Sequence, residues 1–194
     1  MAGQSPAPIF TTVRLAIVVA SPADANLYVR LWTDPRVMGN VGFPQGIPTT
    51  QEEVAARIRA EQDQPPFGRL LLVRRQADGQ AIGECKLYRP DRDGISETDI
   101  KLLPRFWSQG YGTEIKRGLI DYLFAHTDCR AVQATPNVDN QASIRMQENV
   151  GGICVGLSIF RFPAQTAMPT QTVHSYIYRV FRPGVALDED MLLS

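Results

Sequence analysis

The residues whose types and spacing point most directly to chemistry form the glycine-containing segment 108–113, Ser-Gln-Gly-Tyr-Gly-Thr. It joins an apolar run that ends near Leu102 to an amphipathic run that starts near Gly110. A strand-to-helix junction of this kind presents unpaired backbone N–H groups and the positive end of a helix dipole, which together favour binding of a phosphate group. Gly110 and Gly112 would let an anion approach closely, because glycine has no Cβ. A tight turn that needs glycine only for its own geometry is the alternative interpretation.

This segment does not match the common nucleotide-binding motifs. A P-loop requires Gly-Lys-Ser/Thr, whereas Gly112 is followed by Thr-Glu. The spacing of the glycines does not fit the GxGxxG fingerprint of dinucleotide-binding folds either. Transfer of another group from a nucleotide is therefore the weaker hypothesis for this segment.

A second candidate is the charged segment just before the loop. Glu97, Asp99 and Lys101 occupy alternate positions, so a strand would place all three side chains on one face. If this strand forms an antiparallel hairpin with the preceding one, Lys101 faces Glu84 and Asp99 faces Lys86. Glu97 then has no cationic partner, and its carboxylate is a candidate general base. A solvated sheet face without any catalytic role explains the same alternation.

The surrounding elements follow from periodicity and from cap residues. Apolar runs predict strands over 13–20, 68–75, 81–89, 95–103, 131–135, 153–162 and 172–181. Helical spacing and N-cap residues predict helices over 22–34, 50–62, 110–125 and 140–149, with 35–48 as a long loop. In the third helix Ile115 and Leu119 form the apolar face, and Glu114, Lys116, Arg117 and Asp121 the polar one. This order predicts a mixed α/β fold around a largely antiparallel sheet.

Length and composition limit the organisation and the partners. The 194 residues are expected to form one domain, 1–194, with a loose N-terminus (1–10) and an acidic tail (188–194). Twenty basic and 20 acidic residues give a net charge of zero, which argues against binding of nucleic acid or of an anionic membrane. No signal peptide and no run of about 18 apolar residues is found, so no membrane span is expected. Three scattered cysteines and two histidines argue against a metal site and favour a reducing, cytoplasmic location.

Two stretches carry a family resemblance. "FWSQGYGTE" (106–114) and "NQAS" (140–143) resemble the GNAT (GCN5-related) N-acetyltransferases, and the resemblance covers nearly the whole chain. Within that family they are similar to the RimJ/RimL-type branch, which acetylates ribosomal-protein N-termini and which often carries a tryptophan at the position of Trp107. The chain departs from the family at Asp99–Ile100, where a glycine and an aromatic residue are usual. It also has Val150-Gly151-Gly152 in place of Leu-Gly-Phe.

The resemblance implies a sheet that is splayed in the middle, with acetyl-CoA in the gap. The pantetheine arm would run along the strand edge at Ile100, Lys101 and Leu102, and Asn140 would contact it. The pyrophosphate would lie on Ser108, Gln109, Gly110, Tyr111, Gly112 and Thr113. Ser143 matches a serine that this branch carries near the thioester sulfur, and it or a tyrosine would protonate the thiolate. Its alternative role is a local backbone hydrogen bond in the first turn of a helix.

These observations together predict an acetyl-CoA-dependent N-acyltransferase that transfers an acetyl group directly to a primary amine, on a peptide or protein N-terminus or on a small molecule. No cysteine lies in the motif region, so no acyl-enzyme is expected. A non-catalytic acyl-CoA-binding module on the same fold is the alternative. The apolar run 150–160 also indicates a sheet edge that a second copy covers, as in a homodimer. Residues 35–48 and 163–171 are expected to shape the acceptor pocket.

Overall fold

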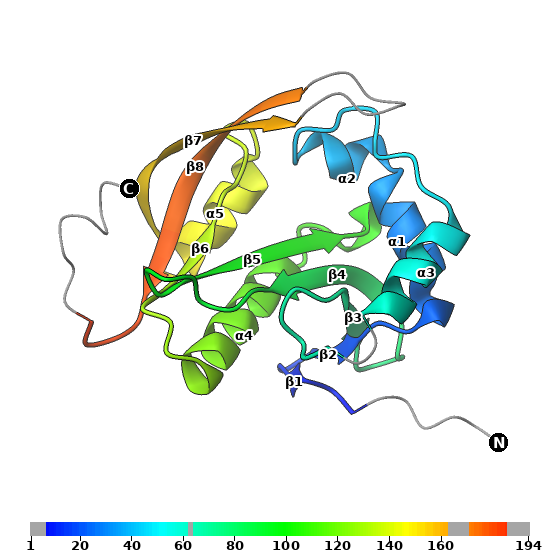
Figure 1. The fold of residues 1–194 in the computed structure, drawn as a ribbon, viewed down its shortest axis with the longest axis horizontal. Coiled ribbons are helices and arrows are strands. Elements are labelled where there is room, and N and C mark those ends of the chain that lie inside the picture. The colour runs from blue at the N-terminus through cyan, green and yellow to red at the C-terminus, as the bar shows by residue number, and fades with distance from the viewer. Residues whose placement is uncertain (1–6, 62–63, 163–170, 186–194) are drawn as a thin grey trace.

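The structure, a computed structural model, describes residues 7–61, 64–162 and 171–185. A single mixed sheet of eight strands runs through the molecule in the order β1-β2-β3-β4-β5-β6-β8-β7 (Figure 1). The strands are β1 (Phe10–Thr11), β2 (Leu15–Val19), β3 (Leu71–Arg75), β4 (Ala81–Leu87), β5 (Ile95–Leu102), β6 (Ala131–Ala134), β7 (Ile153–Phe162) and β8 (Gln171–Phe181). All neighbours are antiparallel except β5 and β6. The predicted mixed, mostly antiparallel fold is confirmed.

The structure tests the prediction for the N-terminal end of the chain but not the one for the C-terminal end. Strand β1 begins inside the segment 1–10 that was expected to be loose, and the Ile9 N–H donates to the Ile17 carbonyl at 2.7 Å. The acidic tail, 188–194, lies outside the described residues, as do residues 163–170.

The first helices follow local cap signals. A 3₁₀ turn, η1 (Pro22–Asp24), leads from β2 into α1 (Ala25–Trp32). Helix α3 (Gln51–Ala60) starts at the predicted capping box, in which the Glu53 N–H donates to Thr50 Oγ1 at 3.2 Å. The prediction of a continuous loop over 35–48 was wrong, because α2 (Pro35–Gly39) lies within it. Proline at the first position and Asp34 as the N-cap start this short helix.

Strands β3, β4 and β5 form the predicted antiparallel meander. The predicted register is confirmed, since Lys101 pairs with Glu84 and Asp99 with Lys86. The predicted ion pair between Asp99 and Lys86 is not formed, however. The carboxylate of Asp99 pairs instead with the ammonium of Lys101 on its own strand.

The sheet is splayed between β5 and β6. Their parallel pairing covers only three positions, from Ile95–Ala131 to Glu97–Gln133. Beyond Glu97, β5 continues to Leu102 while β6 ends at Ala134, so one edge of β5 is left without a strand partner among the described residues.

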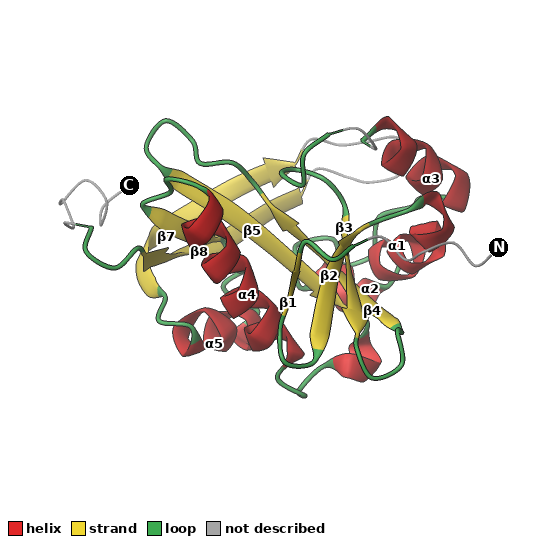
Figure 2. Cartoon of the chain, turned by 90° about the horizontal axis from the view of Figure 1, so that it is seen from below, coloured by secondary structure: helices red, strands yellow, loops and turns green. Residues whose placement is uncertain are grey.

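Helices cover opposite faces of the sheet beside this gap. The long helix α4 (Tyr111–His126) and α5 (Gln141–Asn149) pack against each other (Figure 2). The Lys116 side chain of α4 reaches Thr98 of β5, whereas Trp32 of α1 reaches Glu84 of β4, which is paired with Lys101. Alternate residues of a strand point to opposite faces, so α1 and α4 lie on opposite sides.

The core joins these layers. Its fully buried side chains come mainly from the central strands and from α1 and α4, and include Leu15, Ile17, Leu31, Leu71, Leu72, Ile82, Leu87, Ile115 and Leu119. No helix in the described ranges is both long and apolar enough to cross a membrane.

Candidate active-site cleft

A cleft of about 920 Å³ opens where β5 and β6 separate. Its volume lies at the upper end of the range for small-molecule and cofactor sites, roughly 300–1,000 Å³. All but one of the predicted site residues line it, namely Glu97, Ile100, Lys101, Leu102, Ser108, Gly110, Tyr111, Gly112, Thr113, Asn140 and Ser143. The exception is Gln109, whose side-chain amide donates to the Arg105 carbonyl at 2.9 Å.

The loop after β5 has an unusual backbone. A short 3₁₀ turn, η2 (Pro104–Phe106), precedes it, and Ser108 and Gly110 both have left-handed φ values, 59° and 78°. None of the described residues accepts a hydrogen bond from the backbone N–H groups of residues 108–113. The loop therefore gathers free N–H donors at the N-terminus of α4, which is the arrangement that binds an anion.

Two side chains, Trp107 and Arg14, hold this loop in place. The Trp107 indole N–H donates to the carbonyl of Leu102 at 2.8 Å, so the loop is tied to the end of β5. The Arg14 guanidinium donates to the Gln109 carbonyl at 3.1 Å and to the Glu114 carboxylate at 2.6 Å. Burial raises the pKa of Glu114, but hydrogen bonds from Thr12 and Arg14 outweigh this and leave the pKa below its usual value. Its negative charge in the first turn of α4 is thus matched by Arg14.

The free edge of β5 offers a second set of backbone groups. The Leu103 N–H donates to the Ile82 carbonyl, and the Tyr88 N–H donates to the Glu97 carbonyl. Since hydrogen-bonded pairs alternate along an antiparallel ladder, the backbone groups of Lys101 are also directed to β4. Those of Thr98 and Ile100 are directed to the cleft. Of the three residues expected along the cofactor arm, Ile100 is the best placed, while Lys101 contributes its side chain.

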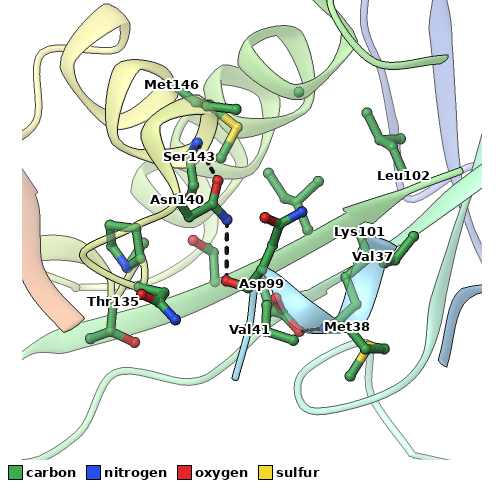
Figure 3. A pocket seen from close by; sticks show the side chains of 18 of the residues that line it. Val37, Met38, Val41, Asp99, Lys101, Leu102, Thr135, Asn140, Ser143 and Met146 are labelled. Carbon is green, nitrogen blue, oxygen red and sulfur yellow. Dashed lines mark hydrogen bonds and ion pairs between the residues drawn. The ribbon is translucent and has the colours of Figure 1, made fainter. Parts of the chain in front are cut away.

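On the face of β5 that points away from Thr98, the Asp99 and Lys101 side chains line the cleft (Figure 3). The Lys101 ammonium pairs with Asp99 and lies 3.3 Å from Oε1 of buried Glu84, which also accepts from the Trp32 indole N–H at 2.8 Å. Burial raises the pKa of Asp99, but the charge and hydrogen bond of Lys101 outweigh it, so the pKa lies below its usual value. Asp99 is thereby held as an ion-pair partner.

Glu97 is differently placed. It is exposed at the point where β5 and β6 part, and its Oε1 accepts from the Gln133 side-chain amide at 3.0 Å. Among the described residues no cation forms an ion pair with it, in agreement with the predicted register. Its carboxylate is therefore available to a ligand in the cleft.

The start of α5 forms the far wall of the cleft. Asn140 is the N-cap, and its Oδ1 accepts from the Ser143 N–H at 3.0 Å. Its Nδ2 donates to the Asn40 carbonyl at the end of α2, at 3.4 Å (Figure 3). Ser143 is half-buried and lines the cleft, and none of the described residues hydrogen-bonds to its hydroxyl.

Lys116 is the site residue that the sequence analysis missed. Its assignment to the polar face of α4 was wrong, since it is 1% exposed and its Nζ donates to Thr98 Oγ1 at 2.6 Å. Burial lowers the pKa of Lys116 to about 7. The signal was present in the helical spacing, because Gly112, Lys116 and Ile120 follow one another at intervals of four residues. The Met146 side chain packs at Gly112, so this stripe faces α5.

Several apolar and aromatic residues of the cleft come from α2 and the segment that follows it. Val37, Met38, Val41 and Phe43 line the cleft and come from the segment 35–48, which was expected, together with 163–171, to shape the acceptor pocket. Phe43 packs on Phe162 of β7 with ring centroids 5.0 Å apart. The described residues contain no cluster of three or more His, Cys, Asp or Glu side chains arranged to hold a metal ion.

Known proteins share both the sequence pattern and the fold. A curated relative, the FsC-acetyl coenzyme A-N(2)-transacetylase of Aspergillus fumigatus, is 26% identical over 159 residues, which are 74% of this chain and 64% of the relative. An acetyltransferase of the GNAT family from Bacillus anthracis superposes with a TM-score of 0.71 at 19% identity, covering 88% of this chain and 96% of that structure. A spermidine N-acetyltransferase from Vibrio cholerae, solved with CoA and spermine, gives 0.67 at 16% identity over 85% and 95%.

The family assignment rests on the sequence itself. The acetyltransferase (GNAT) domain family matches residues 14–153, which include the loop after β5, all of α4 and most of the cleft. These are the elements that bring the free N–H groups, the free edge of β5 and Glu97 together. The chain belongs to the GNAT acetyltransferase family.

Proposed function

We propose that the protein is an acetyl-CoA-dependent N-acetyltransferase of the RimJ/RimL-type branch, which transfers an acetyl group directly to a primary amine. The observation that carries the proposal is the single cleft into which three features open. These are the free N–H groups of residues 108–113, the unpaired edge of β5 and the carboxylate of Glu97. Membership of the GNAT family supports the reaction class.

Acetyl-CoA fits the chemistry of the cleft. Its pyrophosphate would accept hydrogen bonds from the backbone N–H groups of residues 108–113, at the positive end of α4. Its pantetheine arm contains amide groups, which can pair with the N–H and carbonyl of Ile100 in the way that an added strand would. Asn140 lies opposite β5 and would contact the same arm.

Two side chains would handle protons. An amine must lose a proton before it can attack the thioester, and Glu97 is the β5 carboxylate for which the described residues offer no ion-pair partner. The Ser143 hydroxyl would donate a hydrogen bond to the departing sulfur. Asp99 is held by Lys101 and would keep its charge throughout.

The acceptor is proposed to be a primary amine without a strong net charge. Among the described residues, four basic side chains and four acidic ones line the cleft, namely Arg57, Lys86, Lys101 and Lys116, and Glu84, Glu97, Asp99 and Asp139. This balance disfavours a highly basic or a highly acidic acceptor. A peptide or protein N-terminus or a neutral small-molecule amine fits better than a polyamine.

The proposal also includes a homodimer and a cytoplasmic location, with no nucleic-acid or membrane partner. The zero net charge supports the absence of such partners, since either would require a basic surface. The exposed apolar strand β7 supports the dimer.

The decisive experiment measures CoA release from acetyl-CoA with a panel of peptide N-termini, polyamines, amino acids and aminoglycosides. With an accepted amine, Glu97→Gln is expected to lower kcat by roughly 10²- to 10⁴-fold, the usual range for general-base catalysis, with acetyl-CoA affinity nearly unchanged. Asp99→Asn is the matched control, because it makes the same change two residues away on the same strand face. It should change kcat only slightly.

Two results would contradict the proposal. Tight binding of acetyl-CoA without CoA release over the whole panel would favour a non-catalytic acyl-CoA-binding module. Full activity of Glu97→Gln together with loss of activity in Asp99→Asn would assign the base to Asp99.

A further inference from the structure

Lys116 is a buried ammonium side chain without a buried counter-charge. Its side chain is 1% exposed, and its Nζ donates a 2.6 Å hydrogen bond to the neutral hydroxyl of Thr98. No carboxylate of the described residues lies within ion-pairing distance of it. An unpaired charge is costly to bury, and a packed apolar residue at this position would avoid that cost.

The elements packed against Lys116 direct no charged side chain toward it. On β5 the charged residues Glu97, Asp99 and Lys101 point to the opposite face from Thr98. On α5 the titratable side chains are engaged elsewhere, since Arg145 donates to the Gln141 carbonyl and Glu148 accepts from Tyr178. Strand β1, Phe10–Thr11, has no titratable residue. Burial is accordingly the one cause that lowers the pKa of Lys116.

Lys116 also lines the cleft, beside Thr98 and close to the point where β5 and β6 begin to pair. Trp107 ties the loop to Leu102, so an arm that starts at the loop runs along the free edge of β5 from Leu102 past Ile100 to Thr98. At about 3.3 Å per residue, this path is on the order of 13 Å long. It cannot continue, because β6 pairs with β5 from Glu97 backwards. The acyl end of the arm therefore arrives beside Thr98, the hydrogen-bond partner of Lys116.

We propose that Lys116 donates the proton that the CoA thiolate acquires as it leaves. This inference rests on the proposed function, because it takes acetyl-CoA as the donor. The thiolate that the reaction creates beside Thr98 is then the counter-charge of Lys116, which the residues around Lys116 do not supply. Ser143, from the facing helix, would orient the sulfur by a hydrogen bond and keep its own proton.

The proton and electron balance is complete without any further reactant. The acceptor nitrogen forms a bond to the carbonyl carbon, the carbon–sulfur bond breaks, and its electron pair stays on the sulfur. One proton passes from the Lys116 ammonium to the sulfur, which gives the CoA thiol. The acceptor nitrogen loses two protons, one that Glu97 takes before the attack and one that leaves the nitrogen once the new bond has formed. Both pass by way of Glu97 to solvent. Lys116 regains one proton from solvent, so each turnover releases one proton.

The first test needs no turnover. The thiol of CoA bound to the protein is titrated by the ultraviolet absorbance of its thiolate, with the wild type and with Lys116→Met, which keeps the length of the side chain. A neighbouring ammonium group stabilises a thiolate, so the bound thiol should ionise at least about one pH unit lower in the wild type. Equal titration in both proteins would overturn the inference. Failure of the wild type to bind CoA would overturn the proposed function itself.

The second test separates proton donation from a structural role. Lys116→Met should lower kcat with acetyl-CoA by roughly 10²-fold or more and leave KM for acetyl-CoA nearly unchanged. With an acetyl aryl thioester, whose thiolate needs no proton to leave, wild type and variant should react at nearly equal rates. An equal loss with both donors would mean that Lys116 only supports the fold. If Ser143→Ala abolishes the thiol shift and Lys116→Met does not, the donor is Ser143 and the inference is wrong.

Discussion

Lys101 and Lys116 lie on opposite faces of β5, and the pKa values of their side chains are shifted in opposite directions. Their surroundings explain the difference. Burial alone lowers the pKa of Lys101, but the carboxylates of Asp99 and Glu84 outweigh it and raise the pKa above its usual value. Lys116 has only a hydroxyl group beside it, so burial dominates and lowers its pKa to about 7. Lys101 is therefore a fixed charge, whereas Lys116 can exchange a proton near neutral pH.

This contrast predicts a pH-dependent stability difference for Lys116→Met. Between about pH 7 and about pH 10.4 the unfolded chain holds a proton on Lys116 that the folded protein has released, so wild-type stability rises with pH in that window. The cost of burying the ammonium is fully present below pH 7. Each pH unit by which folding lowers a pKa corresponds to about 1.4 kcal/mol, so the variant should be more stable than the wild type by several kcal/mol at pH 6. That gain should disappear near pH 10.

Urea unfolding of both proteins at pH 6, 8 and 10 measures this difference. Lys101→Met is the matched control with the opposite sign, because it leaves Glu84 and Asp99 without their cation. It should lose about 3–5 kcal/mol at neutral pH. A stability gain of Lys116→Met that stays constant from pH 6 to 10 would mean that Lys116 stays protonated in the folded protein over this whole range.

At the same scale, the sequence predicted the pairing of charges on β5 but not the burial of Lys116. Period-two alternation and a hairpin are local features, so the register of Lys101 with Glu84 followed from them. Burial of Lys116 depends on α5, which packs on α4 through residues that come some 25 or more positions later in the chain. The preference of lysine for solvent is the stronger local signal, and here it is misleading.

At the scale of elements, the strand-to-helix junction after β5 determines what the cleft can bind. Ser108 and Gly110 have left-handed backbones, and Gly110 is the N-cap of α4. A side chain on Gly110 would meet only the Arg14 guanidinium, at 3.5 Å, so conformation rather than space makes glycine necessary there. Local sequence predicted this junction well, since both helix and strand signals lie within it.

Gly110→Ala is therefore expected to weaken acetyl-CoA binding by about tenfold. Holding alanine in the left-handed region costs roughly 1–2 kcal/mol, and that energy is needed whenever the loop adopts the binding conformation. Gly112→Ala is the control, because Gly112 has no left-handed φ and its added Cβ would meet only the flexible Met146 side chain, at 3.1 Å. Calorimetry with CoA measures both affinities, and equal affinities would remove the loop from the phosphate site.

Helix α2 shows where element prediction failed. Pro35 stops α1 and was interpreted as the start of a loop, yet proline is also a favoured first residue of a helix. The Asp34 side chain accepts from the Arg36 N–H at 2.9 Å, which is an N-cap signal that the sequence contained. This short helix brings Val37 and Met38 to the lining of the cleft.

At the scale of the whole molecule, the order of the strands could not be predicted from local sequence. The β3–β5 meander joins neighbours in sequence, and it was predicted. The parallel contact of β5 with β6 and the antiparallel contact of β6 with β8 join distant segments. No local pattern encodes such contacts, so the splay that creates the cleft was implied by the family resemblance alone.

The strand order leaves β7 at one end of the sheet, with an apolar surface. Leu157 and Ile159 are 68% and 56% exposed, on a strand ten residues long whose outer edge has no partner among the described residues. Long apolar edges promote pairing with another chain, and soluble proteins usually cover or charge them. A second copy pairing along β7 would cover both the edge and the side chains, which is the basis of the proposed homodimer.

The double variant Leu157→Lys/Ile159→Lys is therefore expected to be a monomer at concentrations where the wild type is a dimer. Like charges on two facing copies of β7 repel, and burying them would require desolvation, whereas the monomer keeps them in water. Val13→Lys is the control, since Val13 is 92% exposed on a different part of the chain, before β2, and this change should leave the dimer intact. Light scattering over a range of concentrations measures the mass of all three proteins. A wild type that stays monomeric at high concentration, or a double variant that remains dimeric, would show that β7 does not form the interface.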